Sequence, residues 1–159
     1  MELLESIVGN KNVILTFFAA MIPVLELRFA IPFGVARGLR LWVSIWASVL
    51  GNLVPVPFII LFIHRIFDWL RKKKGRFNAM VETFERRAEG KKATVERYAF
   101  WGLVILVAIP LPGTGAWTGA LVAAMMDMPL KKAFPAIAVG VFIAAVVVSV
   151  ITYGATVVF

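Results

Sequence analysis

The chain has 159 residues, of which 61% are hydrophobic and 16% charged, and its formal net charge is +8. Soluble domains are about 45–50% apolar and about 25% charged, so a soluble fold of this length could not bury so much apolar surface. The absence of cysteine and the single histidine, His64, exclude disulfides and disfavour metal clusters and Ser/His/Asp triads. We therefore expect a small integral membrane protein, without metal or cofactor, that is not an enzyme.

The first apolar stretch covers residues 13–36 and contains two charges, Glu26 and Arg28, flanked by Pro23 and Pro32. Ionisable residues deep in a bilayer are costly unless they are paired or hydrated, so they are functional candidates. Glu26 can exchange a proton or bind a cation, and we predict it as the ion-coupling residue. Arg28 can hold a phosphate or carboxylate with paired hydrogen bonds. The alternative is a structural pair of mutually neutralising charges.

The next stretch, Leu41–Ile63, is uncharged and long enough to span a bilayer. It leads into a connector, residues 65–98, in which eleven basic and five acidic residues account for +6 of the net charge. A basic connector between apolar segments is normally cytoplasmic. The apolar spacing in 78–98 predicts an amphipathic helix on the inner membrane surface, and a solvated cytoplasmic loop is the alternative. The charge pattern thus indicates orientation and no nucleic-acid partner.

The second half repeats this plan. Residues 98–126 are uncharged but contain Pro110-Leu-Pro-Gly-Thr-Gly115, which a straight helix would not accommodate. The arms on either side, 100–109 and 116–126, are each roughly 15 Å long as helices, about half a membrane deep. This pattern predicts a re-entrant hairpin, followed by a second clean span over 133–159.

The two halves align when Ile22-Pro23 is matched with Ile109-Pro110. We therefore predict an all-α membrane protein with one domain, 1–159, built from two inverted repeats. Each repeat is a re-entrant half-helix hairpin followed by a transmembrane helix: repeat 1 is 12–64, the basic amphipathic cytoplasmic connector is 65–98, and repeat 2 is 99–159. Hairpins place both termini outside the cell membrane. Four ordinary spans, two of them kinked by proline, are the alternative and place both termini inside.

The glycine-rich break supplies a second candidate site. Glycines leave backbone N–H groups free to face a ligand, and the N-terminus of a half-helix carries partial positive charge. Together with Arg28, this break suits an anionic headgroup; the alternative is a break that only lets helices pack closely. The candidate substrate-binding residues are Arg28, Arg37, Gly113, Thr114, Gly115, Trp117 and Thr118.

Two motifs carry a family resemblance. The segment Ile22-Pro-Val-Leu-Glu-Leu-Arg-Phe-Ala-Ile-Pro-Phe-Gly34 and the Pro110–Gly115 motif resemble the paired motifs of the small multidrug export protein family, over nearly the whole chain. That resemblance implies membrane export. The segment Met128-Pro-Leu-Lys-Lys132 and the span after it are more distantly similar to the DedA family, which implies two re-entrant hairpins and recycling of polyprenyl-phosphate lipid carriers.

The leading functional interpretation is a transporter or flippase for an anionic amphiphile, with a polyprenyl-phosphate lipid carrier as a candidate substrate. Glu26 would couple proton or sodium movement to it, and a homodimer in contact with membrane lipids would enclose the pathway. The first alternative is a proton-coupled exporter of cationic amphiphiles, with Glu26 as the exchanging site. The second is a membrane scaffold or lipid scramblase that transports nothing actively.

Overall fold

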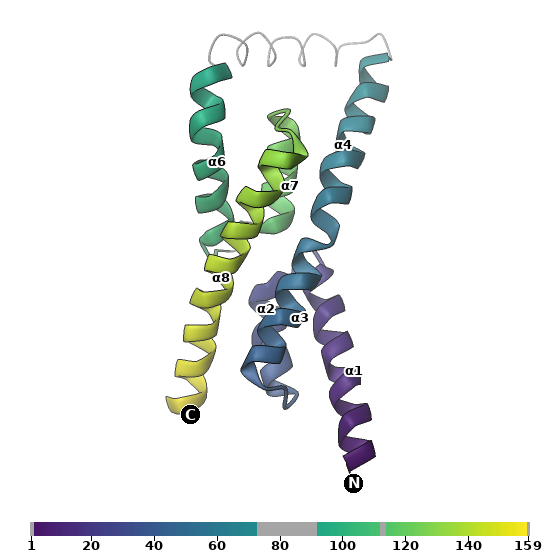
Figure 1. Cartoon of the computed structure of the whole chain (residues 1–159), viewed down its shortest axis with the longest axis vertical. Coiled ribbons are helices and arrows are strands. Elements are labelled where there is room, and N and C mark those ends of the chain that lie inside the picture. Colours follow the sequence, from purple (N-terminus) through teal and green to yellow (C-terminus); the bar gives the residue numbers. More distant parts are fainter. Residues whose placement is uncertain (1, 73–91, 112–113, 159) are drawn as a thin grey trace.

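The computed structural model describes residues 2–72, 92–111 and 114–158, whose regular elements are all α-helices (Figure 1). The helices are α1 (Glu2–Met21), α2 (Glu26–Ala36), α3 (Leu41–Leu53), α4 (Pro55–Lys72), α6 (Lys92–Ala108), α7 (Ala116–Met125) and α8 (Leu130–Val158). Two segments, Leu41–Ile63 and Leu130–Gly154, are long and apolar enough to cross a membrane. The prediction of an all-helical chain with two long apolar segments is therefore confirmed.

The first half of the chain begins with an antiparallel pair of helices. α1 ends two residues before Pro23, whose ring cannot donate the next helical hydrogen bond. The chain turns there, and α2 runs back beside α1, toward the end of the molecule at which the chain began (Figure 1). α3 and α4 then run the length of the molecule, with a break at Val54. Pro55 occupies the first position of α4, where a missing N–H costs little.

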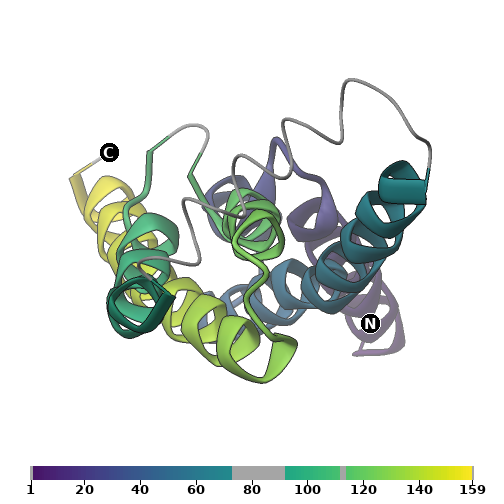
Figure 2. The ribbon, with the colours of Figure 1, turned by 90° about the horizontal axis from the view of Figure 1, so that it is seen from above.

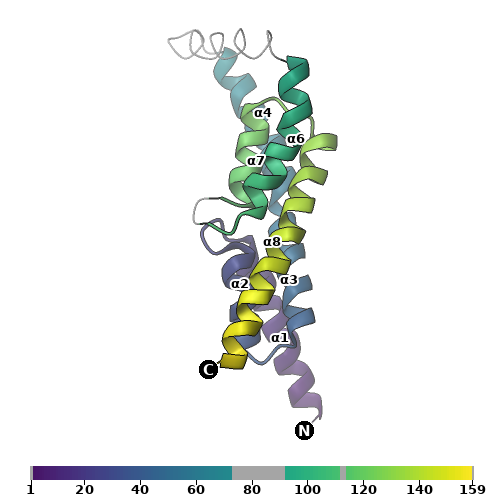
Figure 3. The same cartoon turned by 90° about the vertical axis from the view of Figure 1, so that its left-hand side faces the viewer.

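The second half of the chain contains another antiparallel pair of helices followed by a long helix. α6 descends to mid-height, α7 returns beside it, and α8 then spans most of the molecule in the opposite direction to α3 and α4 (Figure 3). The turn of the α1–α2 pair and the turn of the α6–α7 pair approach each other near the middle of the molecule. The two chain ends lie at the same end of the structure (Figure 1).

Small residues allow the helices to approach closely. A Cβ added at Gly140 of α8 would lie 2.7 Å from the Val107 Cβ on α6, and one at Gly34 of α2 would overlap the Ser44 hydroxyl on α3. Such contacts are typical of helix packing in membranes, where close van der Waals contact replaces the hydrophobic effect as the main attraction. Seen from above, α6 and α8 lie on one side, α1 and α4 on the other, and α2 and α7 between them (Figure 2).

Some helices extend beyond the predicted limits. α1 begins at Glu2, α4 continues to Lys72, and α6 begins at Lys92. The reason is that Lys, Arg, Glu and Ala are good helix formers, so the helices continue past the apolar segments into polar sequence. Most of the amphipathic helix predicted over 78–98 lies outside the described residues, and its last part belongs to α6.

Candidate functional site

The turn between α1 and α2 places Glu26 in the interior. The backbone N–H of Glu26 donates to the Ile22 carbonyl at 2.9 Å. Its φ of 47° is left-handed, which is uncommon for a residue with a side chain. Only 5% of the residue is exposed. Because backbone strain of this kind concentrates at functional sites, the conformation supports a specific role for the Glu26 carboxyl group.

Arg28, one half-turn further along α2, binds the end of α6 and the turn that follows it. Its guanidinium donates to the Ile109 carbonyl at 2.9 Å, to the Leu111 carbonyl, and to the Thr114 hydroxyl oxygen at 2.9 Å. The Thr114 hydroxyl lies 2.7 Å from the Ile109 carbonyl oxygen and can donate to it. A planar, multidentate guanidinium therefore connects the α1–α2 pair to the turn of the α6–α7 pair.

The carboxyl group of Glu26 occupies the N-terminus of α7. The backbone N–H of Trp117 points to Glu26 Oε1 at 3.4 Å. Gly115 lies directly against the carboxyl group, and a Cβ added there would overlap it. With φ of 147° and ψ of −168°, Gly115 also adopts a conformation that is essentially restricted to glycine. Glycine at this position thus allows both the unusual backbone conformation and the close approach of the carboxyl group.

A third contact joins the two turns. The indole N–H of Trp117 donates to the Met21 carbonyl at the end of α1, at 3.0 Å. The last carbonyls of a helix lack intrahelical donors, so this contact satisfies one of them. The two helix pairs are therefore joined by polar contacts at mid-height.

Helix dipoles explain why Arg28 lies at the end of α6 and Glu26 at the start of α7. The C-terminal end of α6 carries partial negative charge, and the cationic Arg28 lies against the carbonyls that follow it. The N-terminal end of α7 carries partial positive charge, and the carboxyl group of Glu26 lies against the Trp117 N–H in its first turn. Two residues of one helix thus match the two opposite helix ends of the facing pair.

The structure brings most predicted site residues together, with three exceptions. Glu26, Arg28, Thr114, Gly115 and Trp117 meet at the junction of the two turns. Thr118 follows Trp117 on α7 and is half-buried. Arg37 lies at the opposite end of α2, where it is exposed and sits 4.9 Å above the Phe33 ring. Gly113 lies outside the described residues.

Sequence reasoning missed the backbone carbonyls that bind Arg28 and Trp117. A signal for them was present, because Pro110 and Pro112 cannot donate hydrogen bonds and a helix that ends at a proline leaves acceptors open. It also missed Ser48 on α3, which is fully buried beside Asn52; Asn52 itself was a candidate from the sequence, as a cavity-lining residue or a partner of a neighbouring helix.

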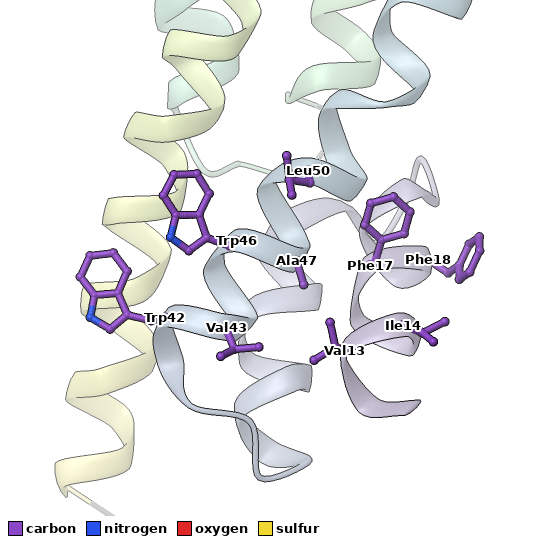
Figure 4. A pocket seen from close by; sticks show the side chains of 9 residues that line it. All are labelled: Val13, Ile14, Phe17, Phe18, Trp42, Val43, Trp46, Ala47 and Leu50. Carbon is purple, nitrogen blue, oxygen red and sulfur yellow. The ribbon is translucent and has the colours of Figure 1, made fainter. Parts of the chain in front are cut away.

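An apolar groove lies apart from this junction, between α1 and α3 (Figure 4). Its volume is about 530 Å³, and its walls include Phe17 and Phe18 of α1 and Trp42 and Trp46 of α3. Small-molecule sites typically enclose about 300–1,000 Å³. In size and character the groove therefore suits the apolar part of a lipid or amphiphile.

The helices and the charged junction define a small helical membrane protein. The chain belongs to the family described as "Putative small multi-drug export protein", which matches residues 26–147 and therefore includes both Glu26–Arg28 and the turn after α6. The family and the two long apolar segments support a membrane location. No curated protein and no solved structure matches the chain, so the DedA similarity stays a prediction.

Proposed function

We propose that the protein is a membrane transporter that exports an anionic amphiphile, and that the junction of the two turns is its headgroup site. The observation that carries this proposal is the pairing of Glu26 and Arg28 with opposite helix ends. Charged groups at broken helices near mid-membrane are a recurring plan of secondary transporters. Among the described residues, the junction concentrates charge, backbone dipoles and hydroxyl groups at one level of the structure.

In this proposal the α1–α2 and α6–α7 pairs are re-entrant hairpins, each followed by a spanning helix in an inverted repeat. The opposite directions of the two pairs and the meeting of their turns at mid-height support it (Figure 1). The basic connector is then cytoplasmic, and both termini lie outside. Irregular backbone at mid-membrane is tolerated only where protein or a polar cavity covers it, and the two turns cover each other.

An anionic headgroup, such as the phosphate of a polyprenyl carrier, would compete with the Glu26 carboxylate for the N-terminus of α7. Helix N-termini bind phosphates through free N–H groups and the helix dipole. Arg28, Thr114 and Gly115 are already placed at this junction. Gly113, Thr118 and Arg37 are the further proposed contacts, and the apolar groove of α1 and α3 takes the tail.

Glu26 provides the ion coupling in this scheme. A carboxylate is a stronger acceptor than a neutral carboxylic acid, so its protonation weakens the contact with the Trp117 N–H. Proton binding therefore releases the α7 N-terminus to a headgroup, and headgroup departure allows the carboxylate to return. Transport of one anion is linked in this way to movement of a proton, and a homodimer encloses the pathway in contact with membrane lipids.

The test is reconstitution into liposomes with a fluorescent polyprenyl phosphate and, separately, a lipophilic cation. We expect the wild-type protein to move the phosphate lipid, and Glu26→Gln and Arg28→Ala to lose that movement while still eluting as folded protein. Arg40→Ala is the matched control, because Arg40 is exposed in the turn before α3, at the far end of α2. No phosphate-lipid movement by the wild-type protein would overturn the proposal.

Labelling tests the topology independently. The chain has no cysteine, so single substitutions Lys11→Cys and Lys131→Cys can be labelled from outside with a membrane-impermeant maleimide. Re-entrant hairpins place position 11 outside and position 131 inside. Four kinked spans give the opposite pattern and would refute the hairpins.

A second candidate, proton-coupled export of cationic drugs, is favoured by the family description of multi-drug export. In that case a cation would bind Glu26 and compete with the partial positive charge of the α7 N-terminus. Cation efflux that persists in Arg28→Ala and fails in Glu26→Gln would support this candidate over the first.

A further inference from the structure

The break between α3 and α4 contains buried polar groups that the junction described above does not use. Asn52 is 1% exposed, and neither atom of its amide has a hydrogen-bond partner within the described part of the chain. Ser48, one turn earlier, is completely buried and its hydroxyl oxygen is likewise unpartnered there. Unpartnered buried polar groups are rare in native proteins, and each calls for an explanation.

These side chains lie on one face of α3. Residues four apart on a helix are neighbours on its surface, so Ser44, Ser48 and Asn52 form a continuous polar row. Ser44, at the lower end of this row, donates to the Ile31 carbonyl of α2 at 2.8 Å. The row is therefore partnered at its α2 end and unpartnered where α3 ends.

Backbone carbonyls add to the unpartnered oxygens at the upper end of the row. Pro55 and Pro57 have no N–H, so the carbonyls of Gly51 and Leu53 lack the donor that a helix would provide four residues ahead. The Gly51 carbonyl lies on the same side of the helix as Ser48 and Asn52, whereas the Leu53 carbonyl points to the other side. Asn52, Ser48 and the Gly51 carbonyl therefore supply three neutral oxygens within about one turn of helix.

We propose that the α3–α4 break binds a monovalent alkali cation, with Na⁺ as the expected ion. Backbone carbonyls that lack their helical donor coordinate such ions in the interrupted helices of transporters. Neutral oxygen ligands fit a singly charged cation, and no cluster of three or more acidic or histidine side chains occurs in the described ranges to hold a multivalent metal. A partly hydrated Na⁺ satisfies both amide atoms of Asn52, because its water accepts from the amide nitrogen.

The position of the break gives the cation a role. The α3–α4 break lies at about the height of the two turns (Figure 1), so the cation and Glu26 occupy the same level of the structure. Its role as a co-transported ion rests on the proposed function. The cation site itself rests only on the buried oxygens of α3.

The experiment measures thermal unfolding of the detergent-solubilised full chain through its tryptophan fluorescence, with NaCl replaced stepwise by choline chloride at constant ionic strength. We expect a saturable rise of about 2–4 °C with Na⁺ for the wild-type protein. Asn52→Leu and Ser48→Ala should lose this rise. Ser149→Ala on α8 should keep it, because Ser149 is buried and already donates to the Ala145 carbonyl.

A direct binding measurement with radioactive ²²Na⁺ on the same proteins makes the test independent of folding stability. Loss of binding in Ser48→Ala, which removes only one oxygen, supports the site even where Asn52→Leu fails to fold. A wild-type protein that does not distinguish Na⁺ from choline overturns the proposal, and so does full Na⁺ binding by Asn52→Leu. These measurements need no transport, so failed transport with Na⁺ binding intact counts against the proposed function alone.

Discussion

Replacing Arg28 with lysine tests the connection between the two helix pairs, because it keeps the positive charge and removes the fork of donors. Arg28 binds three acceptors on or after α6: the carbonyls of Ile109 and Leu111 and the Thr114 hydroxyl. A lysine ammonium is a compact donor on a flexible stem and cannot reach all three in the geometry of a planar guanidinium. We expect it to keep one contact and to lose two.

The expected loss of stability depends on whether the hydrogen bonds lie in water or in a membrane. Hydrogen bonds to charged groups contribute about 1.5–3 kcal/mol in soluble proteins. Interhelical hydrogen bonds in membranes average about 0.6 kcal/mol and reach about 1.7 kcal/mol, because the unfolded chain in a membrane also finds partners. Arg28 lies at a turn junction in a chain with membrane-length helices, so the membrane values apply. Two lost bonds then destabilise the Arg28→Lys variant by about 1–3 kcal/mol.

The assay is reversible SDS-induced unfolding in mixed micelles, followed by tryptophan fluorescence. Arg40→Lys is the control, since Arg40 is exposed at the opposite end of α2, and it should unfold with the wild-type midpoint. A double-mutant cycle with Thr114→Val should give a coupling free energy of about 1 kcal/mol. An Arg28→Lys variant as stable as the wild-type protein, or no coupling to Thr114→Val, would refute the proposed connection.

Three further substitutions probe the packing around the junction in the same unfolding assay. Gly115→Ala should destabilise the protein by about 1–3 kcal/mol, because the φ of 147° at Gly115 excludes a side chain and the added Cβ meets the Glu26 carboxyl group. Gly102→Ala is the control: nothing lies within 4 Å of its added Cβ, so it should be neutral or stabilising. Trp117→Phe removes the donor to the Met21 carbonyl and should cost about 0.5–1.5 kcal/mol, and wild-type stability would contradict that contact. Gly140→Ala should destabilise by about 1–3 kcal/mol through overpacking against Val107, whereas Gly154→Ala should not.

The positions of the helix breaks were predictable from proline and glycine. The motif from Pro110 to Gly115 indicated a turn, and the structure ends α6 at Ala108 and begins α7 at Ala116. The composition of Leu41–Ile63 indicated a membrane-length segment, and Pro55 and Pro57 left a hinge in it open. They did not fix the break at Val54, because Pro55 can sit either inside a kinked helix or at the start of a new one.

The contacts at the site were less predictable than its residues. Glu26 and Arg28 stood out because charge is rare in apolar sequence. Their partners are backbone N–H and carbonyl groups, which every residue carries and which no sequence pattern marks as available until the helix ends are known. The pairing across more than eighty residues depends on the tertiary arrangement of the two helix pairs.

Arg28 and Glu26 make contacts of opposite polarity at the junction, so ligand binding to one variant reveals the sign of the transported group's charge. An anionic group that binds at the α7 N-terminus must displace the Glu26 carboxylate and can keep Arg28 as a partner. A cationic group must displace Arg28 from the carbonyls after α6 and can keep Glu26. Glu26→Gln removes a carboxylate that competes with an anion but would bind a cation. The variant should therefore bind an anion more tightly and a cation more weakly. This difference in binding remains measurable even where transport of both is lost with the coupling carboxylate. Equilibrium binding of a phosphate lipid to Glu26→Gln therefore separates the two candidate functions: tighter binding supports the anionic substrate, and unchanged binding removes Glu26 from the headgroup site.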